Sequence, residues 1–298
     1  MRVTNNMVVN NVLYNLSQGA SRLARYQNQL SSGRRILVPS DDPVGTVNAM
    51  YIRSQRLEKE RYLKNVEDGL GWLEATERAL HEMSDLLTRA RELAVQGASE
   101  TLPESSRAAL AAEVGQLLEH AIELANTSYG GKYIFAGFET LQLPFAAVGE
   151  PVTSVTYRGD DGGIEREIAP GVTMEVNFPG SRAFGGLYDV FTILAGLRDD
   201  LASGDTDRIR TERIGAMDGA LDQILGLRAE AGARLNRLEL AKNRLEDESL
   251  SLTRFLSEEE DADLARVLVQ FSAGEAAYRA ALTAGARIIQ PTLVDFIR

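Results

Sequence analysis

Few side chains in this sequence have both the type and the spacing that catalysis or metal binding requires. The chain contains two histidines, His81 and His120, and no cysteine. No second histidine follows four residues after His81-Glu82, so the zinc-protease motif is absent. The lack of cysteine excludes disulfides, thiol catalysis and thiolate metal sites. We therefore expect both histidines to lie on solvated or half-buried helix faces.

Two pairs of adjacent aspartates could hold a cation, but each pair has a simpler structural role. Asp41 and Asp42 precede Pro43, and a carboxylate before a helix-initiating proline caps the helix. Asp160 and Asp161 lie in a glycine-rich turn without the ligand ladder or trailing glutamate of a calcium loop. No Walker loop, nucleophile elbow or dinucleotide fingerprint is present. The sequence therefore predicts no enzyme, no cofactor and no metal site.

Composition limits the partners. The 298 residues carry a formal net charge of −11, which argues against nucleic acid as the main partner because phosphate binding needs a basic surface. The sequence has no apolar run of about 18 residues that could insert into a membrane. The N-terminus has no apolar core typical of a cleaved signal peptide. Composition alone thus indicates a cytosolic protein, unless export uses a route without a cleaved signal.

The apolar pattern predicts long helices in the first half of the chain. Steps of four and three residues between positions 9 and 30 form a heptad seam. A second helix is expected from Pro43 to about Ala98, and Thr101 with Glu104 reads as a capping box that starts a third helix. The residues of the first seam are Val9, Leu13, Leu16, Ala20, Leu23, Gln27 and Leu30.

The second half returns to the helical period from Tyr188. Residues 214–256 form the most regular heptad pattern in the chain, with apolar d positions and mixed a positions. A last helix carries a single apolar stripe that continues beyond Pro291. The d positions are Met217, Ile224, Ala231, Leu238, Leu245 and Leu252. The final stripe comprises Leu264, Leu268, Phe271, Tyr278, Leu282 and Ile289, with Leu293 and Phe296 beyond the proline.

Between the helical halves the apolar period changes to two, which predicts strands. Segments 132–136, 152–158, 164–168 and 172–178 alternate or are rich in strand-forming residues. The glycine-rich turn at 159–163 is expected to join the second and third strands. The fold class predicted from the residues is therefore mainly α with a small antiparallel β insert.

Several stretches together resemble bacterial flagellin-type proteins, in particular those of the hook–filament junction. The resemblance covers nearly the whole chain. Where flagellins continue Ala-Ala-Gly after the paired aspartates, this chain has Pro43, and the ending from Leu293 to Arg298 also differs from the usual flagellin ending. The stretches that carry the resemblance are Gln29 to Ile36, Pro39 to Pro43, Asn126 with Tyr133 to Phe138, Tyr157 to Asp160, and Arg228 to Glu239.

The resemblance implies a flagellin-like architecture of three layers. The N- and C-terminal helices would pair as an inner coiled coil that lines the export channel. The parts of a helical middle domain would flank an outer β-rich domain. The implied segments are 1–42 and 257–298 for the inner coiled coil, 43–129 and 189–256 for the middle domain, and 130–188 for the outer domain.

The same resemblance implies a structural role without enzymatic activity. The protein would be an adaptor at the hook–filament junction, exported without a cleaved signal by the flagellar type III route and therefore extracellular. Its partners would be other copies of itself in a helical ring, the other hook–filament junction protein, flagellin, and an export chaperone before secretion. Head-to-tail contacts of this kind build open helical assemblies.

The terminal apolar stripes are the expected assembly interface, although packing within one chain would explain the same pattern. We also expect the terminal helices to order only when many copies pack together. The interface residues predicted are Val9, Leu13, Leu16, Leu23, Leu30, Leu264, Leu268, Phe271, Tyr278, Leu282, Ile289, Leu293 and Phe296.

Two other classes remain as alternatives. A filament flagellin would share the terminal helices and the stretch from Arg228 to Glu239. A cytosolic coiled-coil scaffold would share the heptads and the composition. The scaffold leaves unexplained both the β insert and an N-terminal segment, residues 1–35, that has five basic residues and no acidic one.

Overall fold

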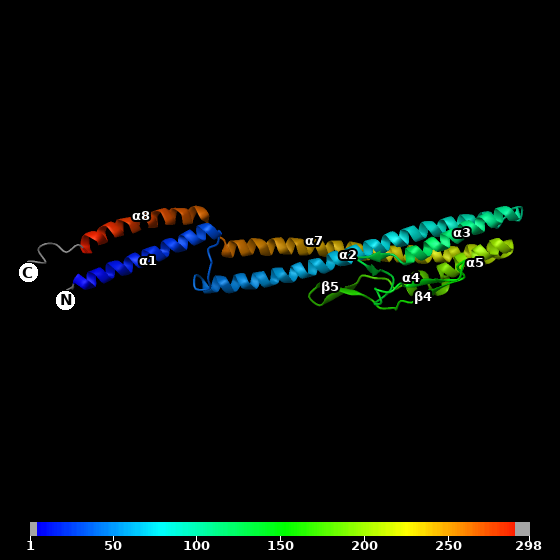
Figure 1. Cartoon of the computed structure of the whole chain (residues 1–298), viewed down its shortest axis with the longest axis horizontal. Helices are drawn as coiled ribbons and strands as arrows, with labels where there is room; N and C mark the ends of the chain where they lie inside the picture. The colour runs from blue at the N-terminus through cyan, green and yellow to red at the C-terminus, as the bar shows by residue number, and fades with distance from the viewer. Residues whose placement is uncertain (1–4, 290–298) are drawn as a thin grey trace, which may run out of the picture. The chain divides into compact units, whose positions relative to one another are not determined.

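The computed structural model describes residues 5–289 and divides the chain into two compact units. The unit formed by Met1–Glu58 and Glu248–Arg298 is here called the terminal unit, and the unit formed by Lys59–Asp247 is called the body. Helices α2 (Pro43–Gly97) and α7 (Ile214–Glu260) each contribute residues to both units. Figure 1 shows the elements in chain order.

The first and last helices pack against each other in the terminal unit. Helix α1 (Asn5–Ser32) lies beside α8 (Leu264–Ile289) in antiparallel orientation (Figure 1). Glycines bring the two backbones close. A Cβ atom added to Gly19 would lie 3.1 Å from the Tyr278 ring, and one added to Gly274 would lie 3.2 Å from Leu23. The residues of α1 and α8 thus interdigitate, as the predicted pairing of the terminal helices requires.

The predicted seam of α1 was only half right. Alternate residues of the seam, Val9, Leu16, Leu23 and Leu30, are half-buried and are here called its a positions. The residues between them, Leu13, Ala20 and Gln27, are exposed. Helix α1 contacts α8 through the neighbouring face instead, where small or aromatic residues allow close packing. The heptad count could not separate these two faces, because both lie next to the a positions. The second half of the true seam consists of Val12, Gly19 and Tyr26.

The body holds the core. Helices α2, α3 (Glu104–Ala125), α5 (Val190–Ser203) and α7 enclose a continuous apolar cluster. The first five d positions of α7, from Met217 to Leu245, are buried, and the a positions are half-buried, so the predicted pattern is confirmed. Short helices connect these elements: α4 (Gly180–Phe184), the 3-10 turn η1 (Gly186–Tyr188), α6 (Thr206–Arg208) and the π-helical turn η2 (Ile209–Arg213).

The capping box predicted for α3 is wrong. Helix α3 begins at Glu104 with Pro103 as its N-cap, and no side chain caps it. The Thr101 hydroxyl contacts Ser99 instead. Because proline fixes its own φ near −65°, it can begin the helix without a side-chain acceptor.

The β insert consists of three two-stranded antiparallel sheets. Strand β1 (Ser128–Tyr129) pairs with β2 (Lys132–Tyr133), β3 (Phe145–Val148) with β4 (Ser154–Tyr157), and β5 (Glu165–Ala169) with β6 (Val172–Glu175). The predicted hairpin across 159–163 is wrong, because β4 pairs with the preceding strand β3 and not with the following strand β5. Strand β3 was missed, since Phe-Ala-Ala-Val is too short to show alternation.

An aromatic cluster explains why β3 lies where it does. The Phe145 ring packs against Phe184 and Phe191, with centroids 5.7 and 5.1 Å apart, and against Tyr157 at 5.0 Å. The Asn126 side chain, just after α3, donates to the carbonyl of Phe145 and accepts from its N–H, both at 2.9 Å. Packing and two hydrogen bonds therefore fix the insert to the helices of the body.

Candidate assembly surface

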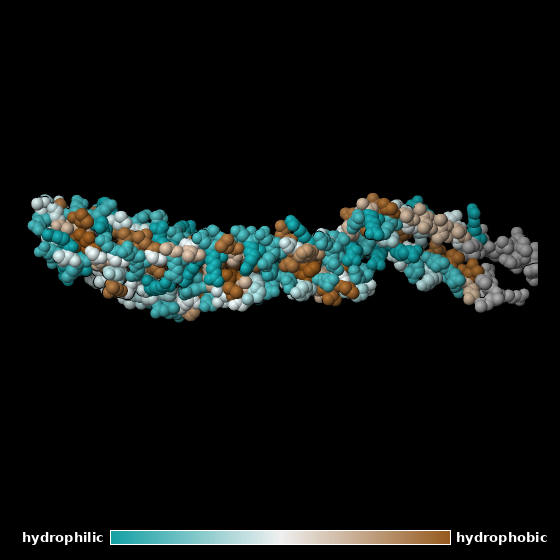
Figure 2. All heavy atoms as spheres, turned by 180° about the vertical axis from the view of Figure 1, so that it is seen from behind, coloured by the Kyte–Doolittle hydropathy of each residue, from teal (hydrophilic) through white to brown (hydrophobic). Residues whose placement is uncertain are grey.

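The terminal unit has almost no core of its own. Among the described residues, Ala49 and Val267 are its only buried apolar side chains. A helix pair with so little burial gains little from the hydrophobic effect, which scales with the apolar area removed from water. The terminal unit nevertheless exposes many large apolar residues, and Figure 2 shows brown, hydrophobic residues at its surface beside the grey termini.

The predicted interface residues fall into two groups. Leu13, Leu264, Leu268 and Leu282 are exposed, at 53, 50, 57 and 45% of their surface. The others within the described part are half-buried: Val9, Leu16, Leu23, Leu30, Phe271 and Tyr278.

The half-buried group fits pairing within the chain, as the Gly19–Tyr278 and Gly274–Leu23 contacts show. The exposed group remains available to other molecules. Ile289 ends α8 and its side chain is not described, while Leu293 and Phe296 lie outside the described residues.

A second exposed apolar surface was missed by the sequence reading. It lies on the first four turns of α2 and is here called the α2 stripe. The signal was present, because the ten residues Pro43–Ile52 contain no charge at all. An exposed helix without charged residues is unusual for a soluble surface. The α2 stripe comprises Val44, Val47, Met50, Tyr51 and Leu57.

Polar contacts hold together the helix ends of the terminal unit. The Arg35 N–H donates to the carbonyl of Glu260 at 2.6 Å, and the Ala262 N–H donates to the carbonyl of Gly33 at 2.9 Å. The buried Glu260 carboxylate pairs with Arg53 at 2.6 Å. These contacts join the segment after α1 to the turn between α7 and α8, and so they set where the two terminal helices begin and end.

Asp42 performs the capping role predicted from its position before Pro43. Its carboxylate accepts the Gly45 N–H at 2.9 Å and pairs with Arg35 at 2.9 Å. The Gly45 N–H and, secondarily, Arg35 stabilise the charged form, so the pKa of Asp42 is lowered from its ordinary value of 3.8. Asp41 accepts the N–H groups of Leu37 and Val38, each at 3.2 Å.

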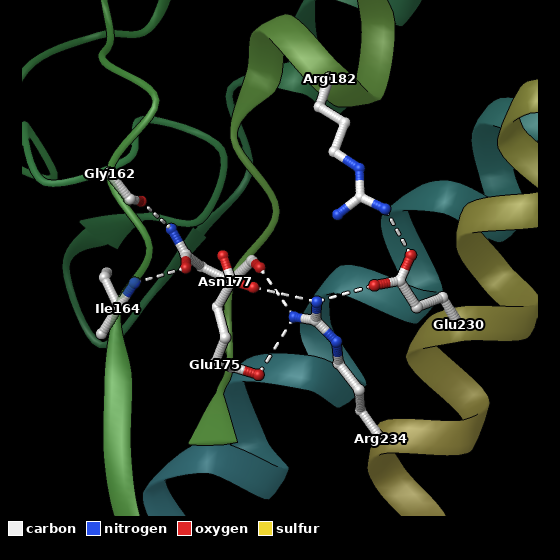
Figure 3. A network of polar contacts seen from close by, with 7 residues as sticks. All are labelled: Gly162, Ile164, Glu175, Asn177, Arg182, Glu230 and Arg234. Atoms are coloured by element: carbon white, nitrogen blue, oxygen red, sulfur yellow. Dashed lines mark hydrogen bonds and ion pairs between the residues drawn. The ribbon is translucent and has the colours of Figure 1, made fainter. Parts of the chain in front are cut away.

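A polar network in the body explains part of the stretch from Arg228 to Glu239. Figure 3 shows the Arg234 guanidinium reaching from α7 to the segment after β6. It donates to the carbonyls of Glu175 and Asn177, at 3.1 and 3.2 Å, and pairs with the Glu175 and Glu230 carboxylates, at 3.1 and 2.7 Å. It also lies 4.4 Å from the centroid of the Phe178 ring.

Asn177 extends this network across the insert. Its fully buried side chain accepts the Ile164 N–H at 2.7 Å and donates to the Gly162 carbonyl at 2.8 Å (Figure 3). On the same helix as Arg234, Arg228 pairs with Glu77 of α2 at 2.9 Å. These residues therefore fix the insert and α2 to α7, which is a structural role.

The residues considered for chemistry are occupied by structural contacts or lie in solvent. His81 and His120 are exposed beside Asp85 and Glu123. Asp160 accepts the N–H groups of Phe138 and Gly162. Within residues 5–289, no group of three or more candidate ligands could hold a metal ion. None of the described helices is both long and apolar enough to cross a lipid bilayer.

Comparison with known proteins identifies the class of this chain. A model of the bacterial flagellin N-terminal helical region matches residues 3–140. With the helical fold and its small antiparallel sheets, this match confirms the predicted flagellin-like fold class. The chain thus has a flagellin-like fold, and the relatives that it matches are structural proteins of the bacterial flagellum.

Within that class, the chain resembles hook-associated proteins. Flagellar hook-associated protein 3 of Escherichia coli (strain K12) is 24% identical over 310 residues, covering 94% of this chain and 96% of that protein. Bacillus cereus FlgL is 26% identical with a TM-score of 0.60, covering 70% of this chain and 99% of that one. A flagellar hook-associated protein from Vibrio parahaemolyticus shares the fold at 20% identity, with a TM-score of 0.68 over 74% of this chain and 100% of that one.

These similarities confirm the resemblance predicted from the sequence and a function as flagellar structural adaptor. Filament flagellins also match over most of the chain, but that alternative has less support.

Proposed function

We propose that this chain is the adaptor at the hook–filament junction, placed between the other hook–filament junction protein and the flagellin filament. It acts there without enzymatic activity. It reaches this extracellular position through the flagellar export route, with a chaperone before secretion. Likeness to flagellar hook-associated protein 3 over 94% of the chain supports the position.

One observation carries the assembly role: within the described residues, the terminal unit exposes many large apolar side chains and fully buries almost none. In water this arrangement is unfavourable by roughly 25 cal/mol for each Å² of apolar surface left exposed. Packing against other copies, the other junction protein and flagellin would remove that surface from water. A head-to-tail contact of unlike surfaces also allows an open helical assembly.

The predicted interface can be tested with Leu282→Asp in the full-length protein. A charge at this exposed position of α8 should abolish assembly and leave residues 43–256 folded, because the side chain contributes nothing to the core of the body. Leu225→Asp on α7 is a matched control, since Leu225 is 44% exposed and Leu282 is 45% exposed. Sedimentation would measure assembly, and circular dichroism would measure folding.

Normal assembly of Leu282→Asp would contradict the role of α8, and equal loss in both variants would show a general effect of charge.

A strain in which this gene is deleted tests the position of the protein in the flagellum. Bare hooks with flagellin released into the medium would support the junction role. Absence of flagellin from both cells and medium would mean that this chain is the filament protein, and intact filaments would contradict both functions.

A further inference from the structure

The exposed surface of α2 changes character within one continuous helix. Along the body, its outward positions are charged, as at Glu67, Glu74 and Glu82. In the terminal unit, its outward positions form the α2 stripe, where Val44, at 71% exposed, is the most exposed residue. The change coincides with the boundary between the units at Glu58. Helix formation does not explain this change from charged to apolar residues, since both parts of α2 are helical.

The spacing of the α2 stripe suits a second helix. Val44, Val47 and Tyr51 follow steps of three and four, and Met50 and Leu57 are seven residues apart. Side chains at these spacings line one face of a helix and receive an apolar helix laid along them. The opposite face of the same segment packs inside the chain through the buried Ala49. The α2 stripe is thus a helical face that no part of the chain between residues 5 and 289 covers.

This chain contains a face of matching kind on α8. Leu264, Leu268, Val269 and Leu282 remain exposed after α8 has packed against α1. They extend over about 27 Å of helix, against about 20 Å for the α2 stripe, at 1.5 Å per residue. We propose that the α2 stripe binds the exposed face of α8 from a second copy of this chain. The proposal rests on the proposed function and names the surface on which α8 docks.

Area favours another copy as the occupant. The five side chains of the α2 stripe could bury on the order of 500 Å² at most, below the roughly 800 Å² per partner of a stable isolated interface. Such a contact is too small for a tight one-to-one complex with a free protein. It suffices in an array, where neighbouring contacts raise the effective concentration of the two faces. The two faces differ, so the contact is head-to-tail and propagates.

Methionine reactivity offers a direct test, because oxidation follows exposure. Met50 lies in the α2 stripe and is 63% exposed, whereas Met83 and Met217 are buried in the body and serve as internal controls. The full-length protein would be treated with dilute hydrogen peroxide as a monomer and after assembly at high concentration in a salting-out buffer. Peptide mass spectrometry would then give the oxidation rate at each methionine. We expect Met50 to react in the monomer and at least fivefold more slowly in the assembly.

Met7 on α1 is also exposed, and its oxidation rate distinguishes failure of the α2 docking from failure of the proposed assembly role. Assembly with Met7 protected and Met50 still reactive would overturn the α2 docking and leave the proposed function intact. A chain that sediments only as monomer under all conditions would overturn both. Protection of Met50 that appears only with added flagellin would overturn the choice of a second copy as occupant.

A pair of valine variants on the same helix gives an independent test. Val47→Asp places a charge in the α2 stripe, and Val95→Asp places one at an exposed valine in the body. We expect Val47→Asp to raise the concentration needed for assembly at least tenfold, and Val95→Asp to leave it unchanged. Equal behaviour of the two variants would overturn the proposal, and circular dichroism would show whether each variant is folded.

Discussion

The terminal unit and the body use the same long helices for opposite purposes. In the body, α2 and α7 bury apolar faces against α3, α5 and the insert and expose charges. In the terminal unit, the remaining parts of α2 and α7 expose Val47, Met50 and Phe255 and bury little. A single helix can therefore belong partly to a self-sufficient fold and partly to a surface that is completed by neighbours. This difference predicts where a substitution will affect stability and where it will affect assembly.

The largest effect on stability should come from the aromatic core of the body. Phe184→Ala removes a fully buried ring that packs on Phe135, with centroids 4.7 Å apart, and on Phe145. We expect a loss of about 3–5 kcal/mol in the free energy of unfolding. The nearby exposed Leu187→Ala should change it by less than about 0.5 kcal/mol. Denaturant titration measures both, and similar values would show that the body lacks a specific core.

A smaller loss is expected from the polar network of the body. Arg234→Ala leaves two carboxylates and two carbonyls without a shared donor, so unfolding should become easier by about 2 kcal/mol. The exposed Arg237→Ala on the same helix is the control, with an expected change within about 0.5 kcal/mol. If the two variants unfold at the same denaturant concentration, the network does not fix the insert.

The smallest effect should appear in the terminal unit as a dependence on pH. Because the pKa of Asp42 is lowered in the folded state, its contribution is complete above the ordinary value of 3.8. The contribution is lost as the pH falls through the lower folded-state pKa, since the unfolded state binds the proton first. Asp42→Asn keeps an acceptor for Gly45 but cannot titrate.

Hydrogen exchange of the first turns of α2, corrected for the intrinsic rate, would detect this difference. Between pH 5 and pH 2, protection should fall further in the wild type than in Asp42→Asn. Parallel loss in both proteins would show that Asp42 does not control the start of α2.

The spacing of apolar residues, together with the glycines and prolines at helix ends, was enough to predict the long helices. The expected helix from Pro43 to Ala98 is α2, which ends one residue earlier, and the d positions of α7 lie in the core. These predictions succeeded because each depends on local residues and on one repeating face. The resemblance to flagellin-type proteins likewise rested on stretches whose residues stabilise the fold. Asp42 caps α2, and Arg234 belongs to the polar network that joins α7 to the insert.

Predictions failed where distant residues decide the outcome. Strand β4 pairs with β3 because Phe145 enters an aromatic cluster formed by α4 and α5, which no local pattern around 159–163 reveals. The face of α1 that meets α8 depends on Gly19, whose missing side chain admits Tyr278. No prediction from the sequence covered the α2 stripe, because its residues follow no single heptad frame and only the structure shows that they are exposed.

We expect the terminal unit to become fully ordered only when other molecules cover it. Hydrogen exchange of the full-length monomer, followed by mass spectrometry, would measure this order. Peptides of α1 and α8 should exchange orders of magnitude faster than peptides of α3, α5 and the body part of α7, and assembly should remove the difference. Protection of α1 and α8 in the monomer equal to that of the body would contradict this expectation.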